Sequence, residues 1–153
     1  MANNDGGAEP GTVGSWAKRC YLAGRLAMED ALRPYDLGAT QWYLLHRLAQ
    51  DGPTMQRDLL RALQIERATL SVVVGTLVRK GLVEQVPDRV DRRQKLLRMT
   101  RAGVRLWSRL PDLSVIHRTA FDGLDSADVA AAIRVLRTAT ERLESYSRER
   151  EET

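Results

Sequence analysis

The sequence predicts one mainly α-helical domain that carries a single small β-hairpin. Apolar residues recur at helical spacing in six segments, and two short apolar runs in the second half flank an Arg-rich stretch. Gly and Pro residues separate most of these segments, as expected for helix ends and turns. A chain of 153 residues is long enough for one such domain with a core of its own.

The first predicted helix spans residues 15–33, after a polar, Gly-rich stretch at 1–14 that we expect to be a flexible tail. Ser15 is the expected N-cap of this helix. Pro34 ends it, because the residue before a proline is held out of the helical conformation. The apolar stripe consists of Trp16, Cys20, Ala23, Ala27 and Ala31, with Leu22 and Leu26 beside it.

Three shorter helices are predicted next, at residues 38–52, 54–64 and 65–81. Thr54 is the expected N-cap of the second of these, and Gly81 ends the third. The third contains many β-branched residues, which are poor helix formers, so its prediction depends on one apolar stripe and on the glycine. That stripe consists of Leu70, Val73, Val74 and Leu77.

After these helices the pattern changes from helix to strand. Apolar runs at 82–86 and 95–99 are the expected strands of a β-hairpin. The stretch between them, Pro87–Gln94, is polar and rich in Arg and Asp, so it forms a long loop.

The end of the chain is predicted to be helical again. One helix follows Thr100, its expected N-cap, and has a break near Pro111. A last helix spans 125–147 with Asp125 as its N-cap. Residues 148–153 then form a charged tail.

Composition disfavours several classes of protein. Cys20 is the only cysteine, so a disulfide framework within one chain is excluded and a reducing, cytoplasmic setting is expected. The sequence has no apolar run of the ~18 residues that a membrane span needs. It holds no metalloprotease, redox, P-loop or serine-hydrolase motif, and His46 and His117 lie in different predicted helices. We therefore expect no enzyme, no metal and no cofactor.

Charge is distributed unevenly along the chain. Residues 54–109 contain 13 Lys and Arg against 5 Asp and Glu, whereas the whole chain has a net charge of only +4. The remainder is therefore mildly acidic. A basic segment attracts phosphate, although an ordinary solvated surface can have the same composition.

The middle of the chain, a short helix, a tight turn, a second helix and a hairpin, has the plan of a winged helix-turn-helix. Over residues 16–146 the sequence resembles the MarR family of bacterial transcriptional regulators. The similar stretches are ATQWYLLHRLA at 39–49, TMQRDLLRALQIERATLSVVVGTLVRKGLVEQ at 54–85 and DRRQKLLRMTRAG at 91–103. The last resembles the family's wing signature, in which an acidic residue and an arginine precede a strand, a threonine and a glycine.

This resemblance implies an obligate homodimer that binds a pseudo-palindromic DNA operator and has no catalytic activity. Residues 15–147 would form one domain. Within it, 38–99 would be the winged helix-turn-helix lobe, and 15–33 and 100–147 would supply the helices of the dimer interface.

The second helix of the helix-turn-helix would enter the major groove and meet base edges with residues near its N-terminus. Arg67 suits a guanine or a phosphate, and Thr69 and Ser71 can donate hydrogen bonds to either target. Thr76 completes this set of candidates. Val72 has two interpretations: either it is one more core residue, or it faces outward and contacts a thymine methyl group.

The Arg-rich loop would be the wing, whose tip enters the adjacent minor groove, where the negative potential attracts an arginine. Arg93 matches the family's wing arginine, and Asp91 matches the acidic residue before it. We expect Asp91 to hold the Arg93 guanidinium through a bidentate pair. Arg89, Arg92 and Lys95 would contact phosphates. For an arbitrary Arg-rich loop, a solvated surface is the simpler interpretation.

The helix before the turn offers further candidates. Thr54, Gln56 and Arg57 open it, at a place where such residues often contact the DNA backbone. Capping and solubility are the alternative explanation for all three.

A small-molecule effector site is also implied, because the family commonly binds small aromatic or phenolic anions. Trp42 and His46 lie one helical turn apart and share a face. A core tryptophan beside a surface histidine would show the same spacing. The candidate residues are Trp16, Tyr35, Trp42 and His46.

The sequence favours a repressor that a small ligand releases from DNA, and two alternatives stay open. One is a winged-helix module that binds proteins instead of DNA, since Lys and Arg are scarce on the outer face of 67–76. The other is a redox-sensing repressor that uses Cys20, which lies in the first helix as in some family members. Those sensors pair the thiol with tyrosines near the start of the second helix, where this chain has Gly-Ala-Thr, so we expect Cys20 to be buried by packing.

Overall fold

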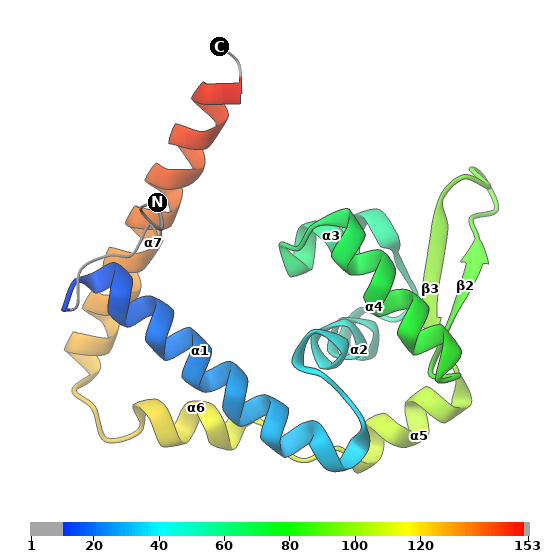
Figure 1. The fold of residues 1–153 in the computed structure, drawn as a ribbon, viewed down its shortest axis with the longest axis horizontal. Helices are drawn as coiled ribbons and strands as arrows, with labels where there is room; N and C mark the ends of the chain where they lie inside the picture. The colour runs from blue at the N-terminus through cyan, green and yellow to red at the C-terminus, as the bar shows by residue number, and fades with distance from the viewer. Residues whose placement is uncertain (1–10, 152–153) are drawn as a thin grey trace, which may run out of the picture. The chain divides into compact units, whose positions relative to one another are not determined.

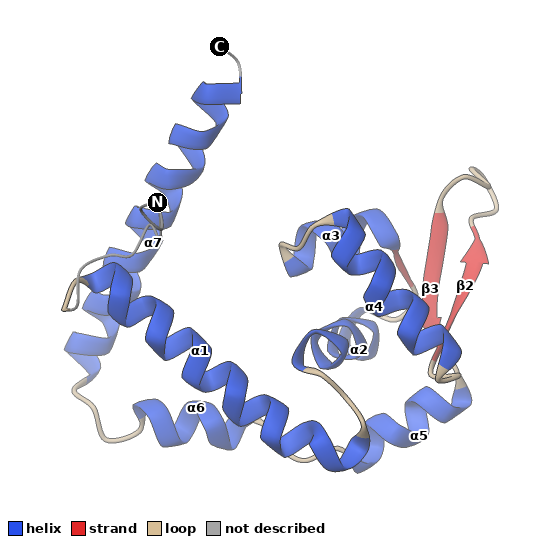
Figure 2. Cartoon of the chain, viewed as in Figure 1, coloured by secondary structure: helices blue, strands red, loops and turns tan. Residues whose placement is uncertain are grey.

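Figure 1 shows the computed structural model of the protein, which describes residues 11–151. This range contains seven α-helices, one 3-10 turn and a small three-stranded sheet (Figure 2). The elements are α1 (Val13–Leu32), η1 (Arg33–Tyr35), α2 (Ala39–Asp51), β1 (Thr54–Met55), α3 (Gln56–Leu63), α4 (Arg67–Arg79), β2 (Val83–Pro87), β3 (Lys95–Met99), α5 (Arg101–Arg109), α6 (Ser114–Phe121) and α7 (Ser126–Glu151). The predicted fold is confirmed, and the expected break near Pro111 separates α5 from α6.

The described chain divides into two units, one ending at Leu113 and the other beginning at Ser114. In the first unit, α2 lies at the centre of the core and contacts α1, α3, α4, α5 and β3. Each neighbour contributes leucines or valines from its apolar face, and burying one such side chain stabilises the fold by about 2 kcal/mol. The buried cluster consists of Leu32, Leu37, Leu44, Leu45, Leu48, Leu59, Leu70, Val74, Leu77, Val83 and Leu97.

The sheet contains one strand that the sequence did not predict. Its order is β1-β3-β2, and Thr54 and Met55 of β1 pair with Leu97 and Leu96 of β3. Thr54 was expected to cap a helix over 54–64, but its hydroxyl donates to the Gly52 carbonyl at 2.8 Å, and α3 begins only at Gln56. Thr54 joins the sheet because β3 supplies backbone groups that pair with it. These groups are distant in sequence, so no local pattern around Thr54 predicts the strand.

The ends of three helices test the predicted N-caps. Thr100 and Asp125 are confirmed, since their side chains accept hydrogen bonds from backbone N–H groups in the first turns of α5 and α7. Ser15 is wrong: α1 begins two residues earlier, and the hydroxyl of Thr12 accepts from the Ser15 N–H at 3.2 Å. Thr12 therefore satisfies one of the N–H groups that a helix start leaves without a partner.

The two predicted tails have different outcomes. The last helix does not end at 147 but continues to Glu151, so residues 148–151 of the expected charged tail are helical. Residues 1–10 of the expected N-terminal tail lie outside the described residues, whereas Val13 and Gly14 already belong to α1.

Both helices of the second unit expose apolar side chains to solvent. Neither α6 nor α7 has a buried residue in the part of the chain that the structure describes. The exposed apolar residues of this unit are Val115, Phe121, Leu124, Ile133, Val135, Leu136, Leu143 and Tyr146. A helix of this length in a globular protein normally buries its apolar face, so these helices lack a packing partner within the unit.

Gly103 lies where α5 crosses the start of the hairpin. A Cβ atom added to it would collide with the backbone carbonyl oxygen of Leu82. That carbonyl also accepts a hydrogen bond from the N–H of Thr100 at 3.0 Å, so it is held in place. The close approach explains why the segment after the hairpin has a glycine here.

We expect Gly103→Ala to lower the free energy of unfolding by about 1–3 kcal/mol, because the added methyl group forces α5 away from the hairpin. Gly24→Ala is the matched control, since Gly24 also lies inside a helix but its added Cβ meets no atom within 4 Å. The control should change stability by less than about 1 kcal/mol, and in the stabilising direction. Urea unfolding followed by circular dichroism, at equal protein concentrations, measures both variants. Equal midpoints for Gly103→Ala and the wild type would contradict the prediction.

Candidate nucleic-acid interface

Helices α3 and α4 form a helix-turn-helix whose turn is set by Gln64. This residue adopts a left-handed conformation with φ of 52°, and its N–H donates to the Leu60 carbonyl at 3.0 Å. A left-handed residue at this place ends α3 and reverses the chain toward α4. The turn therefore forms without a glycine, which is why a simple search for glycine does not find it.

Helix α4 buries one stripe and exposes the opposite face. Leu70, Val74 and Leu77 are at most 1% exposed and pack in the core. Val72 is 68% exposed, so of its two interpretations the core one is wrong for this chain. The candidates Arg67, Thr69 and Ser71 are exposed as well.

Thr76, the remaining candidate of α4, differs from the others because its hydroxyl is already occupied. Its Oγ1 donates to the Val72 carbonyl at 3.0 Å and accepts from the Arg79 guanidinium at 3.1 Å. Both contacts lie within the helix. Thr76 thus lies beside the outward face, but its hydroxyl must give up a bond to contact a ligand.

The three candidates near the start of α3 also differ in how far their side chains are already bonded within the chain. Thr54 lies in β1 and bonds to Gly52. The Gln56 side chain accepts a hydrogen bond from the side-chain amide of Gln85 at 2.9 Å, which links α3 to β2. Arg57 alone has an exposed charged group, 3.9 Å from the carboxylate of Asp58.

The predicted hairpin is confirmed, and carboxylates shape the loop at its tip. The N–H of Asp88 donates to the Gln94 carbonyl at 3.0 Å and closes the loop. The Asp88 carboxylate accepts from the N–H groups of Val90 and Asp91 at 3.3 and 3.1 Å. Aspartate commonly bonds in this way to backbone groups two or three residues ahead. We call β2, β3 and the loop 88–94 the wing.

The expected pair between Asp91 and the Arg93 guanidinium is not formed. The Asp91 carboxylate accepts from the backbone N–H of Arg93 at 3.0 Å, and no ion pair within residues 11–151 joins the two side chains. Aspartate commonly accepts from the backbone N–H two residues ahead, and this bond needs no long side chain to be ordered. Asp91 therefore orients the loop backbone and leaves the side chain of Arg93 available.

The basic side chains of the wing differ in their availability. Arg98 of β3 is paired with Glu84 across the hairpin, with 2.6 Å between Nε and Oε1. The wing candidates of the loop and the start of β3 are exposed and form no ion pair in the described part of the chain. They are Arg89, Arg92, Arg93 and Lys95. The structure thus places several unpaired cations on one loop. Figure 1 shows this loop projecting at the end of the hairpin, whose strand β2 contacts α4.

Two of the four effector candidates meet in the structure. The rings of Trp42 and His46 stack with centroids 4.8 Å apart and an angle of 8° between their planes. Trp107 of α5, which the sequence did not single out, lies 5.6 Å from Trp42 and 5.8 Å from His46. No pattern in the sequence connects α5 with α2, because this contact depends on how the two helices pack.

The other two effector candidates lie apart from this stack. Tyr35 is half-buried and packs against the core, as Trp42 also does. Trp16 is 59% exposed on α1, where the guanidinium of Arg19 lies 5.2 Å from its ring centre. The residues of the stack are therefore Trp42, His46 and Trp107, which we call the aromatic stack.

Cys20 is exposed on α1, contrary to the expectation that packing buries it. It shares its helix with the exposed apolar residues Val13, Trp16, Tyr21, Leu22 and Leu26. Helix α1 is thus amphipathic, but most of its predicted apolar stripe is not covered by other residues of the same chain. Only Met28 and Leu32, near the C-terminal end of the helix, are buried.

The described residues offer neither a metal site nor a membrane-spanning helix. Among residues 11–151, no group of His, Cys, Asp and Glu side chains is arranged to hold a metal ion. In the same residues, no helix combines the length and apolarity needed to cross a membrane.

Residues 35–94, from the end of η1 to the end of the wing loop, match a family model described as the MarR family. The match covers less than half of the chain and shows a similarity to this family over that segment. The curated relatives that the chain matches are named transcriptional regulators and not enzymes, in agreement with the expected class of protein.

Several named relatives and solved structures are similar to this chain over most of its length. The transcriptional repressor NicR of Pseudomonas putida is 25% identical over 126 residues, which make up 82% of this chain and 80% of NicR. The structure of Bordetella bronchiseptica BpsR, whose DNA binding is regulated by 6-hydroxynicotinic acid, has 25% identity and a TM-score of 0.75, over 88% of this chain and 96% of BpsR. PcaV of Streptomyces coelicolor, solved with its natural ligand, has 26% identity and a TM-score of 0.70, over 92% and 98% of the two chains.

Asp88→Ala should loosen the tip of the wing without affecting the core. The change removes the acceptor of the Val90 and Asp91 N–H groups, so we expect their amide hydrogen exchange to rise by about fivefold, the effect of one lost hydrogen bond. Unfolding in urea should be unchanged to within about 0.5 kcal/mol, as for other exposed sites. Asp88→Asn is the control, because it keeps one acceptor oxygen. Unchanged exchange at both amides in Asp88→Ala would show that the carboxylate does not shape the loop.

Proposed function

We propose that this protein is a MarR-family regulator that binds a pseudo-palindromic double-stranded DNA operator as a homodimer and represses transcription until a small aromatic or anionic effector releases it. The observation that carries the proposal is the pairing of two exposed surfaces in the first unit. One is the outward face of α4, and the other is the wing with its unpaired Arg and Lys side chains. A helix and a cationic loop at adjacent positions match the major groove and the neighbouring minor groove of DNA.

In the proposed complex α4 lies in the major groove. Arg67 stands at the first position of the helix, from which a guanidinium can reach a guanine edge or a phosphate. Thr69 and Ser71 are exposed and donate hydrogen bonds to phosphates or bases. Val72 contacts a thymine methyl group, since an exposed apolar side chain at the centre of this face has no polar group to offer.

The wing contacts the adjacent minor groove. Arg93 enters the groove, where phosphates on both sides concentrate the negative potential. Arg89, Arg92 and Lys95 bind phosphates, and Arg57 at the start of α3 binds the backbone across the edge of the major groove. Asp91 serves this arrangement by fixing the backbone of the loop and not by pairing with Arg93.

A second copy of the chain is the proposed partner of the uncovered apolar faces. α1 exposes Trp16, Leu22 and Leu26, and the second unit exposes Leu136 and Leu143. Single exposed apolar residues are common on protein surfaces. Rows of apolar side chains along whole helices are not, and they mark a surface that binds another protein surface. A twofold dimer would present two α4 helices to two half-sites about 34–36 Å apart, as a palindromic operator requires.

The effector is proposed to act on the spacing of the two α4 helices. BpsR is regulated by 6-hydroxynicotinic acid and PcaV was solved with its natural ligand, which supports a small ligand for this protein. The flat rings of Trp42 and His46 suit an aromatic molecule, with Tyr35 and Trp16 as further candidates. A ligand that prefers a dimer whose α4 helices are spaced unsuitably for DNA lowers the affinity for DNA. The size of the effect is the difference between the ligand's binding free energies for the two spacings.

The experiment that tests the proposal is the selection of genomic DNA fragments by the purified protein, followed by sequencing. We expect the retained fragments to share two inverted half-sites. In sedimentation, the purified protein should have twice the mass of one chain. Affinity should fall steeply with added salt, because bound cations release counterions from DNA. A monomer that retains no fragment at low salt would contradict the proposal. A dimer that retains no fragment would favour the alternative protein-interaction module, for which the exposed apolar side chain of Val72 is also suited.

Arg92→Ala should reduce the salt dependence of binding to a selected duplex. Each lost phosphate contact lowers the slope of log K against log salt by about one unit, similarly for all sequences. Arg93→Ala should weaken binding to the selected duplex by about tenfold or more, the effect of losing one specific contact. Arg33→Ala is the control, since Arg33 pairs with Asp30 in a different part of the first unit. Wild-type slopes and affinities for both wing variants would show that the wing does not contact DNA.

Val72→Arg should change base preference at one position of each half-site without affecting folding. The side chain is 68% exposed, so its replacement leaves the core intact. An arginine at this place favours guanine, whereas valine favours thymine. Binding to a panel of duplexes with single-base changes measures the shift. An unchanged preference in a fully folded variant would mean that Val72 does not reach the bases.

A further inference from the structure

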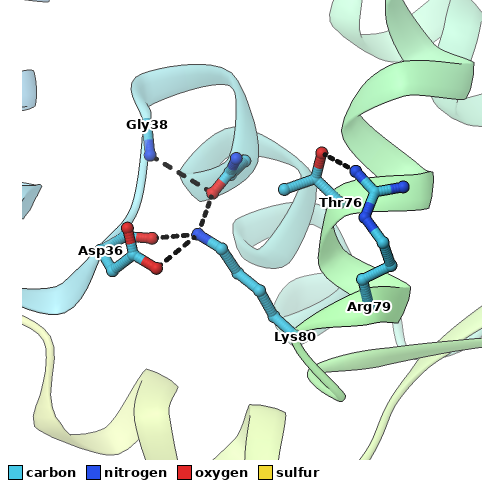
Figure 3. A network of polar contacts seen from close by, with 6 residues as sticks. Asp36, Gly38, Thr76, Arg79 and Lys80 are labelled. Atoms are coloured by element: carbon cyan, nitrogen blue, oxygen red, sulfur yellow. Dashed lines mark hydrogen bonds and ion pairs between the residues drawn. The ribbon is translucent and has the colours of Figure 1, made fainter.

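The end of α4 opposite its DNA-facing start is bonded to the segment that leaves α1. Lys80, the residue that ends α4, extends its ammonium group toward residues 36–41 (Figure 3). Its Nζ donates to the backbone carbonyl of Asp36, lies 3.3 Å from the Asp36 carboxylate and donates to the Gln41 side-chain oxygen at 3.3 Å. An ammonium group has three N–H donors, and here three oxygens face them.

The oxygens that receive Lys80 belong to a segment with a defined shape. Asp36 has a left-handed backbone with φ of 55°, and it closes η1 through its N–H bond to the Arg33 carbonyl at 3.0 Å. The Gln41 oxygen also accepts from the N–H of Gly38 at 3.4 Å, which caps the start of α2. Lys80 thus bonds to two groups that determine how the chain turns from α1 into α2.

This contact differs from an ordinary surface ion pair. The Asp36 side chain is 93% exposed, so its charge contributes little to the attraction. The Lys80 side chain, in contrast, is only 25% exposed, and two of its three acceptors are uncharged oxygens. The contact adds an orientational constraint at the C-terminal end of α4, because hydrogen bonds depend on angle as well as on distance.

We propose that Lys80 is a positioning residue that couples the orientation of α4 to the end of α1. This inference rests on the proposed function, since it concerns how α4 meets DNA. α1 carries the exposed apolar face assigned above to the dimer, and it leads through Arg33–Tyr35 directly into the residues that hold Lys80. A displacement of α1 is therefore transmitted to α4 through this contact as well as through the core.

Arg79 provides a matched control beside Lys80. Its guanidinium bonds to Thr76 on the same helix and not to the α1–α2 segment, as Figure 3 shows. Arg79→Met and Lys80→Met each remove one positive charge, at adjacent positions and with the same new side chain. Any loss of long-range attraction to DNA is therefore equal in the two variants. Lys80→Arg tests rescue, because arginine restores several donors at the end of a long side chain.

The first measurement is binding of a selected duplex at several salt concentrations. We expect Lys80→Met to bind about fivefold to tenfold more weakly than Arg79→Met, the size of a modest coupling free energy. The slope against salt should equal that of Arg79→Met, since Lys80 orients the helix and does not contact phosphate. Lys80→Arg should restore most of the affinity. A lower slope for Lys80→Met would mean that Lys80 binds DNA directly and would overturn the proposal.

The second measurement is amide hydrogen exchange without DNA, which does not depend on the proposed function. Lys80→Met should raise exchange both at residues 36–41 and in the last turn of α4, and Gln41→Leu should raise it in the same two segments. A purely local role would change only the segment that carries the substitution, and that result would overturn the coupling. If the wild type binds no duplex, the proposed function fails with this inference; if it binds and Lys80→Met matches Arg79→Met, only the role of Lys80 fails.

Discussion

The burial of one stripe of α4 against α2 is the constraint on which the rest of the interface depends. Once Leu70, Val74 and Leu77 enter the core, the period of the helix turns Val72 and its neighbours outward. The same core holds Val83 and Leu97 of the wing, so the loop that carries the arginines has a fixed base beside α4. The apolar core thus determines which polar groups are presented together.

Within the wing, the loop carboxylates accept hydrogen bonds from backbone N–H groups and do not pair with any arginine side chain within residues 11–151. A projecting loop has few neighbours, so its N–H groups need local acceptors or water. Asp88 and Asp91 supply these acceptors, which explains why acidic residues alternate with basic ones in a segment of positive charge. The carboxylates of the loop bind backbone N–H groups, and the loop guanidiniums form no ion pair in the described part of the chain, whereas Arg98 on the strand is paired with Glu84. The loop therefore combines a defined shape with available cations.

Most features that the sequence predicted correctly depend on local patterns, although the local N-cap at Ser15 was wrong, and several features that it missed depend on contacts between distant segments. The stripe of α4, the two strands of the hairpin and the caps at Thr100 and Asp125 follow from period and residue type, and all are confirmed. The strand at Thr54, the stacking of Trp107 on Trp42 and the bond from Lys80 to Asp36 each join residues that are distant in sequence. The role of Asp91 was wrong for a different reason, because the resemblance pointed to a side-chain partner while a backbone donor lay closer.

The exposed apolar residues connect the two parts of the proposed mechanism, which are the association of two chains and the orientation of α4. An isolated helix is marginal in water, and α7 extends over 26 residues with no buried side chain among those described. α1 likewise exposes most of its apolar stripe and buries only its C-terminal end, next to η1 and the acceptors of Lys80. In the proposed homodimer the partner covers these faces, and α1 is thereby placed between the dimer interface at one end and the contact with α4 at the other. A change in how two chains associate would then be transmitted to the orientation of α4, because α1 is one continuous helix from Val13 to Leu32.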